Sequence, residues 1–138
     1  MKLHDRSGAD LSTNEVGQRG EDLACLYLRR LGMKVLYRNF DPPRAGEVDV
    51  IYRDKDTLVF GEVKTRTSDD YGRPGDAVDK EKQARVAKGG LAWMRMLDNP
   101  VALFRFDVIE VVLLEGQKPR IELSKEAFHL PKGYTVPE

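Results

Sequence analysis

Two extended segments joined by a very short turn constrain the fold of this chain most strongly. Residues 47–52 and residues 57–65 are rich in valine, isoleucine and aromatic side chains, and the turn residues Asp54, Lys55 and Asp56 lie between them. Strands joined by so few residues pair as antiparallel neighbours. We therefore predict a β-hairpin over residues 47–65, in which side chains from both strands come close together.

Helical and extended segments on either side of the hairpin predict an α/β fold. Apolar side chains recur at helical spacing over residues 15–31, after the N-cap candidates at 12–14. A second long helix is predicted over residues 77–97, with Gly89 and Gly90 weakening its middle. Further strands are predicted over residues 33–40, 104–112 and 120–123. The helix between the third and fourth strands would make them parallel, so the sequence predicts a mixed sheet flanked by helices, in the order α-β-β-β-α-β-β.

Length and composition limit the class of protein. The 138 residues fit one compact domain, predicted over residues 13–138 behind a flexible N-terminal arm of residues 1–12. No apolar run approaches the roughly 18 residues of a membrane span, and no secretory signal is visible, so we expect a cytoplasmic protein without a membrane partner. With 23 basic and 23 acidic residues, the net charge is zero. This balance counts against a simple DNA-coating role, but not against an enzyme whose metal supplies local positive charge.

Acidic and basic side chains on the two hairpin strands form the candidate site. Alternate residues of a strand share a face, so Glu62 and Lys64 point together, and Asp49 points away from Val48 and Val50. Given the right register, Asp49, Glu62 and Lys64 converge on one patch. Carboxylates and waters suit Mg²⁺, and a lysine adds charge near a scissile phosphate. The same alternation is also typical of any half-exposed strand, so spacing alone leaves both interpretations open.

Several motifs resemble the YraN-like family of bacterial proteins. Residues 17–24 (GQRGEDLA) resemble its opening helix, residues 46–51 its second motif and residues 59–66 its third. Tyr71-Gly72, Ala77-Val78 and Lys82 are similar to the segment that enters its second long helix, and residues 105–108 to a later strand. The family consists of predicted endonucleases related to archaeal Holliday-junction resolvases, within the PD-(D/E)xK nuclease superfamily. The chain departs from it at Gly61, where the family commonly has a β-branched residue, and this difference concerns packing.

The resemblance implies a fold, an activity and a set of site residues. The fold would be a restriction-endonuclease-like core in the order α-β-β-β-α-β. Asp49, Glu62 and Lys64 take the catalytic positions, Glu21 takes that of the first-helix acid, and Asp49 and Glu62 would hold Mg²⁺ or Mn²⁺. The implied reaction is hydrolysis of DNA phosphodiesters, with branched, Holliday-junction-like DNA as a candidate substrate and a homodimer as a candidate assembly. Glu21 could equally be a solvated helix residue.

Other polar residues have two interpretations each. Three basic residues that follow the candidate site in the sequence are predicted to contact DNA phosphates: Arg66, Arg73 and Lys82. For any single one of them, a position on a solvated helix face is the simpler interpretation. Asp107 could support a site ligand from behind, cap a loop or pair with Arg105. The rival function is a non-catalytic adaptor that keeps the nuclease fold and binds DNA or a protein.

Overall fold

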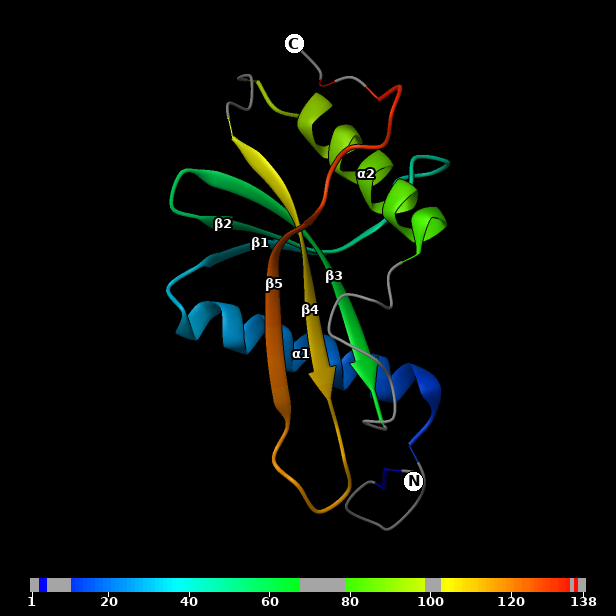
Figure 1. The fold of residues 1–138 in the computed structure, drawn as a ribbon, viewed down its shortest axis with the longest axis vertical. Helices are drawn as coiled ribbons and strands as arrows, with labels where there is room; N and C mark the ends of the chain where they lie inside the picture. Colours follow the sequence, from blue (N-terminus) through cyan, green and yellow to red (C-terminus); the bar gives the residue numbers. More distant parts are fainter. Residues whose placement is uncertain (1–2, 5–10, 68–78, 99–102, 135, 137–138) are drawn as a thin grey trace.

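Two helices and five strands make up the part of the chain that the structure describes (Figure 1). The computed structural model describes residues 3–4, 11–67, 79–98, 103–134 and 136. The elements follow one another as α1 (Thr13–Arg30), β1 (Lys34–Phe40), β2 (Val48–Asp54), β3 (Thr57–Arg66), α2 (Lys80–Arg95), β4 (Phe104–Val112) and β5 (Arg120–Phe128). This order confirms the predicted α-β-β-β-α-β-β arrangement.

The five strands form a single mixed sheet in sequence order, β1-β2-β3-β4-β5. β1, β2 and β3 pair antiparallel, as expected for strands joined by short connections. β3 and β4 pair in parallel with α2 between them in the chain, and β4 and β5 are antiparallel again. The predicted hairpin and the predicted parallel crossover are therefore both confirmed.

The helices cover opposite faces of the sheet and divide the core in two. Phe60 and Val59, neighbours on β3, point to opposite faces and belong to different apolar clusters. The Phe60 cluster is completed by residues of α2, among them Val86, and the Val59 cluster by residues of α1, among them Leu28. In Figure 1, α1 crosses the lower part of the sheet and α2 lies beside its upper part. Neither described helix combines the length and the hydropathy needed to cross a membrane.

α2 runs unbroken through Gly89 and Gly90, where a weak middle was expected. A Cβ on Gly89 would lie 2.7 Å from Val48 Cγ2, and a Cβ on Gly90 would lie 3.0 Å from the ring of Phe60. Both distances are too short for ordinary packing, so the absence of side chains lets the helix lie directly on β2 and β3. The burial gained by this close approach compensates for the low helix propensity of glycine.

β5 extends to Phe128, beyond the predicted end at residue 123. The pairing of β4 with β5 shifts register between Phe106 and Val108, and Glu126 opposite that point has a φ of 53°. Such a bulge interrupts the alternation that marks a strand in sequence. The interruption explains why the second half of β5 was not predicted.

The first residues of the chain contribute to the α1-side core. Leu3 is buried in the cluster that contains Val59, and its carbonyl accepts a hydrogen bond from the Leu11 amide at 2.8 Å. Residues 1–2 and 5–10 lie outside the described residues. The flexible arm over residues 1–12 and the single domain over residues 13–138 therefore remain predictions.

α1 lies close against β3 at Gly20, and replacing this glycine should be costly. A Cβ on Gly20 would lie 1.8 Å from Thr65 Oγ1, so Gly20→Ala should destabilise the fold by about 1–3 kcal/mol through overpacking. Gly17, one turn earlier in α1, has nothing within 4 Å of its would-be Cβ. Gly17→Ala should therefore stabilise by about 0.5–1 kcal/mol through helix propensity. Chemical denaturation of both variants measures the difference, and equal effects would contradict the close approach.

Candidate active site

The candidate site lies where β2 and β3 separate. The two strands pair from Asp54 and Thr57 as far as Val50 and Gly61, and beyond this point β3 continues along β4. Asp49 follows at the fork, and its Oδ2 accepts a hydrogen bond from the Val63 amide at 2.8 Å. The Asp49 carboxylate thus accepts a hydrogen bond that a neighbouring strand would otherwise accept from β3. This bond fixes the carboxylate beside Val63.

The strand alternation predicted around Asp49 is wrong at one point. Val48 and Val50 were expected to share a face, but Val48 belongs to the α2-side cluster and Val50 to the α1-side cluster. Opposite them on β1, Asn39 has a φ of 55°, which interrupts the regular pleat between the partners of Val48 and Val50. Asp49 therefore lies at an irregular point of the sheet rather than within an evenly alternating strand.

The carboxyl groups of Asp49 and Glu62 lie within hydrogen-bonding reach of each other. Glu62 is 2 % exposed, and burial, the charge of Asp49 and a hydrogen bond to Asp49 together raise its pKa from 4.5 to about 8. The opposing effect of the Lys82 ammonium, 2.8 Å from Glu62 Oε1, is smaller. Because the raising effects exceed that of Lys82, the pair of acids favours holding a proton at neutral pH when no metal ion is bound.

Lys82 reaches the site from the first turn of α2. Burial is the largest single influence and lowers its pKa, but the hydrogen bond to Glu62 and the negative charges of Glu62 and Asp49 together raise it by more, so the net shift is upward. The predicted contact of Lys82 with DNA is untested, and the structure gives its ammonium a carboxylate partner inside the site. Only the crossover between β3 and β4 brings this helix to Glu62, so spacing in the sequence could not reveal the pair.

Lys64 lies two residues after Glu62 and shares its face of β3. Its side chain is half-buried. Glu110, its partner residue on β4, forms an ion pair with Arg66 at 3.2 Å. The site thus combines Asp49 and Glu62 with the ammonium group of Lys82, and Lys64 lies on the same face of β3 as Glu62.

Glu21 approaches the site from α1. Its side chain is 19 % exposed, and its pKa is raised by burial and by the charge of Asp49, partly offset by a hydrogen bond from Asn39 and by Arg38. Arg38 Nη2 lies 3.8 Å from Glu21 Oε2. The influence of Asp49 indicates that the two acids are close, but direct or one-water reach of Glu21 to the site remains a prediction.

The donor set at the fork fits a divalent cation that needs few protein ligands. Within the described ranges, no three His, Cys, Asp or Glu side chains are arranged to hold a metal. Mg²⁺ commonly takes one or two carboxylates and completes its shell with waters and substrate phosphate. Asp49 and Glu62 match that requirement, provided that the shared proton leaves when the cation enters.

The two arginines predicted to contact DNA differ in what the structure says of them. Arg66 is 7 % exposed and pairs with Glu110, so its guanidinium is part of the sheet interior. Arg73 lies outside the described residues. Their DNA contacts remain predictions.

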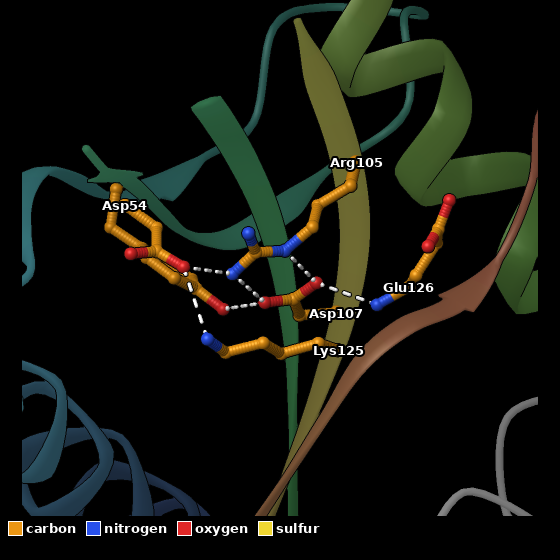
Figure 2. A network of polar contacts seen from close by, with 6 residues as sticks. Asp54, Arg105, Asp107, Lys125 and Glu126 are labelled. Atoms are coloured by element: carbon orange, nitrogen blue, oxygen red, sulfur yellow. Dashed lines mark hydrogen bonds and ion pairs between the residues drawn. The ribbon is translucent and has the colours of Figure 1, made fainter. Parts of the chain in front are cut away.

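Asp107 belongs to a buried polar network rather than to the candidate site (Figure 2). Its carboxylate accepts hydrogen bonds from the Tyr52 hydroxyl at 2.6 Å, from Arg105 Nε at 2.9 Å and from the Glu126 amide at 3.0 Å. Arg105 also contacts Asp54, 2.9 Å away. Of the alternatives left open by the sequence, Asp107 therefore pairs with Arg105 and also satisfies the amide at the β5 bulge.

Gly61 leaves room for this network. A Cβ at Gly61 would lie 2.9 Å from Cε1 of Tyr52 and 2.9 Å from Cδ1 of Ile109. The Tyr52 ring therefore occupies space that a β-branched side chain at this position would need. The departure from the family pattern at Gly61 affects packing on the α1 side and leaves Glu62 on the other face.

The Tyr52 hydroxyl should contribute substantially to stability. Tyr52→Phe keeps the ring beside Gly61 but removes one donor from Asp107, which is 0 % exposed. Loss of a partner for a buried carboxylate should cost about 1–3 kcal/mol. Tyr37→Phe is the matched control. Tyr37 is 49 % exposed, so the loss of its hydroxyl group should cost less than about 0.5 kcal/mol of stability. Equal denaturation midpoints for the two variants would contradict the role of the network.

The fold and the site together define an α/β protein with a nuclease-like core, in which two carboxylates meet where a central hairpin opens. The chain belongs to the uncharacterised protein family UPF0102, whose family model matches residues 20–111. This range contains Glu21, Asp49, Glu62, Lys64 and Lys82. The family predicted from the YraN-like motifs is thereby confirmed.

Relatives from several bacteria match most of the chain. A UPF0102 protein of Geobacter metallireducens is 44 % identical over 130 residues, which cover 94 % of this chain and 98 % of the relative. A relative in Geobacter sulfurreducens is 47 % identical over 115 residues, 83 % of this chain and 89 % of its own length. One in Rhodococcus opacus is 42 % identical over 113 residues, 82 % of this chain and 95 % of its own. These names state a family and no activity.

Proposed function

We propose that this protein is a metal-dependent endonuclease that hydrolyses DNA phosphodiester bonds at the fork between β2 and β3. The observation that carries the proposal is the meeting of two buried or half-buried carboxyl groups, Asp49 and Glu62, with Lys64 on the same face as Glu62. Paired carboxylates beside a lysine suit the cleavage of a phosphate ester, because they hold a cation while the lysine offsets charge on the phosphate.

Each residue has a distinct task in this proposal. In hydrolysis the oxygen of water bonds to phosphorus, one phosphorus–oxygen ester bond breaks, and the departing oxygen takes up a proton. Asp49 and Glu62 would hold Mg²⁺ or Mn²⁺, which when bound activates water and stabilises the departing oxygen. Lys64 would orient water and offset the charge that develops on the phosphate. Glu21 would add negative charge at the edge of the site and help to hold the cation.

Lys82 would act as a positioning residue for Glu62. Its hydrogen bond to Glu62 Oε1, 2.8 Å long, keeps this carboxylate oxygen turned toward α2. A hydrogen-bonding partner behind a metal ligand orients that ligand and limits its side-chain freedom. This geometry supports the assignment of Glu62 as a metal ligand.

Cleavage of defined DNA substrates tests the proposal. The purified full chain is incubated with labelled linear duplex and with a labelled four-way junction, each with Mg²⁺, with Mn²⁺ and with chelator. We expect metal-dependent cleavage that Glu62→Gln abolishes, and faster cleavage of the junction would support the branched-DNA and dimer expectations. Absence of cleavage by the wild-type chain in either metal would refute the proposal.

The alternative is a DNA- or protein-binding adaptor with the same fold. The observation that favours it is the Lys82–Glu62 ion pair, which already neutralises one proposed ligand without a metal. A net charge of zero also fits a protein that does not depend on tight DNA binding. The adaptor would bind a partner without cleaving DNA, and Glu62→Gln would leave that binding unchanged.

A further inference from the structure

Exposed cations gather along the outer side of α2, away from the carboxylates of the candidate site. Lys88 and Arg95 are both exposed, and their separation of seven residues places them on the same side of the helix, about 10 Å apart along its axis. Arg44, in the loop before β2, is also exposed and lines the same hollow. We refer to Arg44, Lys88 and Arg95 as the α2 basic surface.

The loop that carries Arg44 is fixed against α2 by its backbone. The Glu47 amide donates a hydrogen bond to the Arg85 carbonyl at 3.1 Å. Gly46 has a φ of 79°, and a Cβ there would lie 2.1 Å from the same carbonyl oxygen. A glycine in a conformation that other residues avoid therefore permits close contact between loop and helix. The position of Arg44 relative to Lys88 and Arg95 is set by this contact rather than by flexible side chains alone.

The three cations surround a hollow of about 310 Å³, which Leu91 and Tyr134 also line. Among the described residues, none of the three forms an ion pair, whereas nearby Arg85 is paired with Glu47 at 3.5 Å. The net charge of the whole chain is zero, so this concentration of positive charge is a local feature. Cations that form no ion pair with the described residues, held around a concave surface, suit a ligand with regularly spaced negative charges.

We propose that the α2 basic surface binds the phosphate backbone of duplex DNA on one side of the cleavage point. This inference rests on the proposed function, because the same helix begins at the site: Lys82 contacts Glu62 in its first turn, and Arg95 lies in its last. Their separation of 13 positions corresponds to about 20 Å, because each helical residue rises about 1.5 Å. At about 3.4 Å per nucleotide along a strand, the surface reaches roughly six nucleotides from the cut.

The surface would contribute affinity and orientation rather than sequence preference. Arginine and lysine contacts to phosphate position a protein on the duplex without reading its bases. Leu91 and Tyr134 offer an apolar wall on which a deoxyribose can rest. Lys88 and Arg95 follow one another along α2, away from Lys82 in its first turn, so the DNA axis would run roughly parallel to this helix.

Salt-dependent DNA binding tests this inference with matched variants. Binding of a fluorescent duplex several helical turns long is measured by anisotropy in chelator, over a series of salt concentrations. The R44A/K88A/R95A variant is compared with R29A/R30A/K118A, which removes the same charge from exposed positions elsewhere. Loss of three phosphate contacts should make the slope of log affinity against log salt shallower by about 2–3, with an affinity loss of roughly 10–100-fold. The affinity of the control variant should stay within about 2-fold of the wild-type affinity, as expected for cations that make no phosphate contact. The charge-preserving variant R44K/K88R/R95K should bind the duplex like the wild type.

Several results would overturn the inference. One is an equal slope of log affinity against log salt for the two triple variants, and another is the absence of duplex binding by the wild-type chain at low salt. A third is displacement of the bound duplex by an acidic polypeptide as effective as displacement by unlabelled DNA. Circular dichroism of each variant establishes that it is folded. Normal DNA binding without cleavage in Mn²⁺ would refute the nuclease proposal alone, whereas cleavage with unchanged binding by R44A/K88A/R95A would refute this inference alone.

Discussion

Replacing Lys64 with alanine is expected to lower DNA cleavage by about 10²–10³-fold, the loss typical of one preorganised electrostatic group. Lys64 shares a face of β3 with Glu62 and is half-buried, so in the proposed reaction its charge would act on the phosphate with less screening than that of an exposed lysine. Asp49 and Glu62 remain in place in this variant. Metal binding should therefore persist while the chemical step slows.

The control for this variant is Lys34→Ala, which removes an exposed lysine at the start of β1. Cleavage is measured under single-turnover conditions, and Mn²⁺ binding is measured separately by calorimetry. Lys34→Ala should leave both unchanged. Cleavage by Lys64→Ala at the wild-type rate would remove Lys64 from the mechanism, and loss of Mn²⁺ binding would show that its role is structural.

The hairpin was predictable because its signals are local. The turn residues 54–56 and the flanking valines specify two adjacent antiparallel strands without reference to the rest of the chain. The proximity of Asp49 to Glu62 follows from this hairpin, although not through the expected face alternation. The irregular point opposite Asn39 depends on pairing with β1, and a single strand pattern does not contain that information.

Features that depend on long-range packing were not predictable from the same signals. Gly89 and Gly90 look unfavourable for a helix until β2 and Phe60 lie against them. Arg66 looks like a surface cation until Glu110 of β4 is beside it. Lys82 looks like one more basic residue on a helix until the crossover brings it to Glu62. In each case the decisive partner lies more than 20 residues away in the sequence, or on another element.

Metal affinity should rise with pH across the neutral range because Glu62 must lose its proton. Burial and the charge of Asp49 raise the pKa of Glu62 to about 8, so at pH 7 the metal-free site holds a proton that a cation must displace. One displaced proton makes the affinity rise about tenfold per pH unit below pH 8 and level off above it. Calorimetry of Mn²⁺ binding in buffers with different ionisation enthalpies measures both the affinity and the released proton.

Glu47→Gln is the control for this measurement, since Glu47 is half-exposed and pairs with Arg85 outside the site. It should keep the full pH dependence, whereas Glu62→Gln should bind Mn²⁺ weakly and release no proton. An affinity of the wild-type chain that does not change between pH 6 and pH 8 would contradict a protonated Glu62.

The same proton should affect stability, with a definite sign. A carboxyl group whose pKa is raised on folding contributes stability that is complete below its ordinary pKa of 4.5 and is lost as the pH rises through about 8. Glu62→Gln removes this dependence but keeps the shape of the side chain and an acceptor for Lys82. In chelator, the free energy of unfolding of the variant minus that of the wild type should therefore increase from pH 5 to pH 9, by at most about 1.4 kcal/mol per pH unit. If the difference stayed constant or fell, the Glu62 carboxylate would be ionised without a metal, and Lys82 rather than a shared proton would neutralise it.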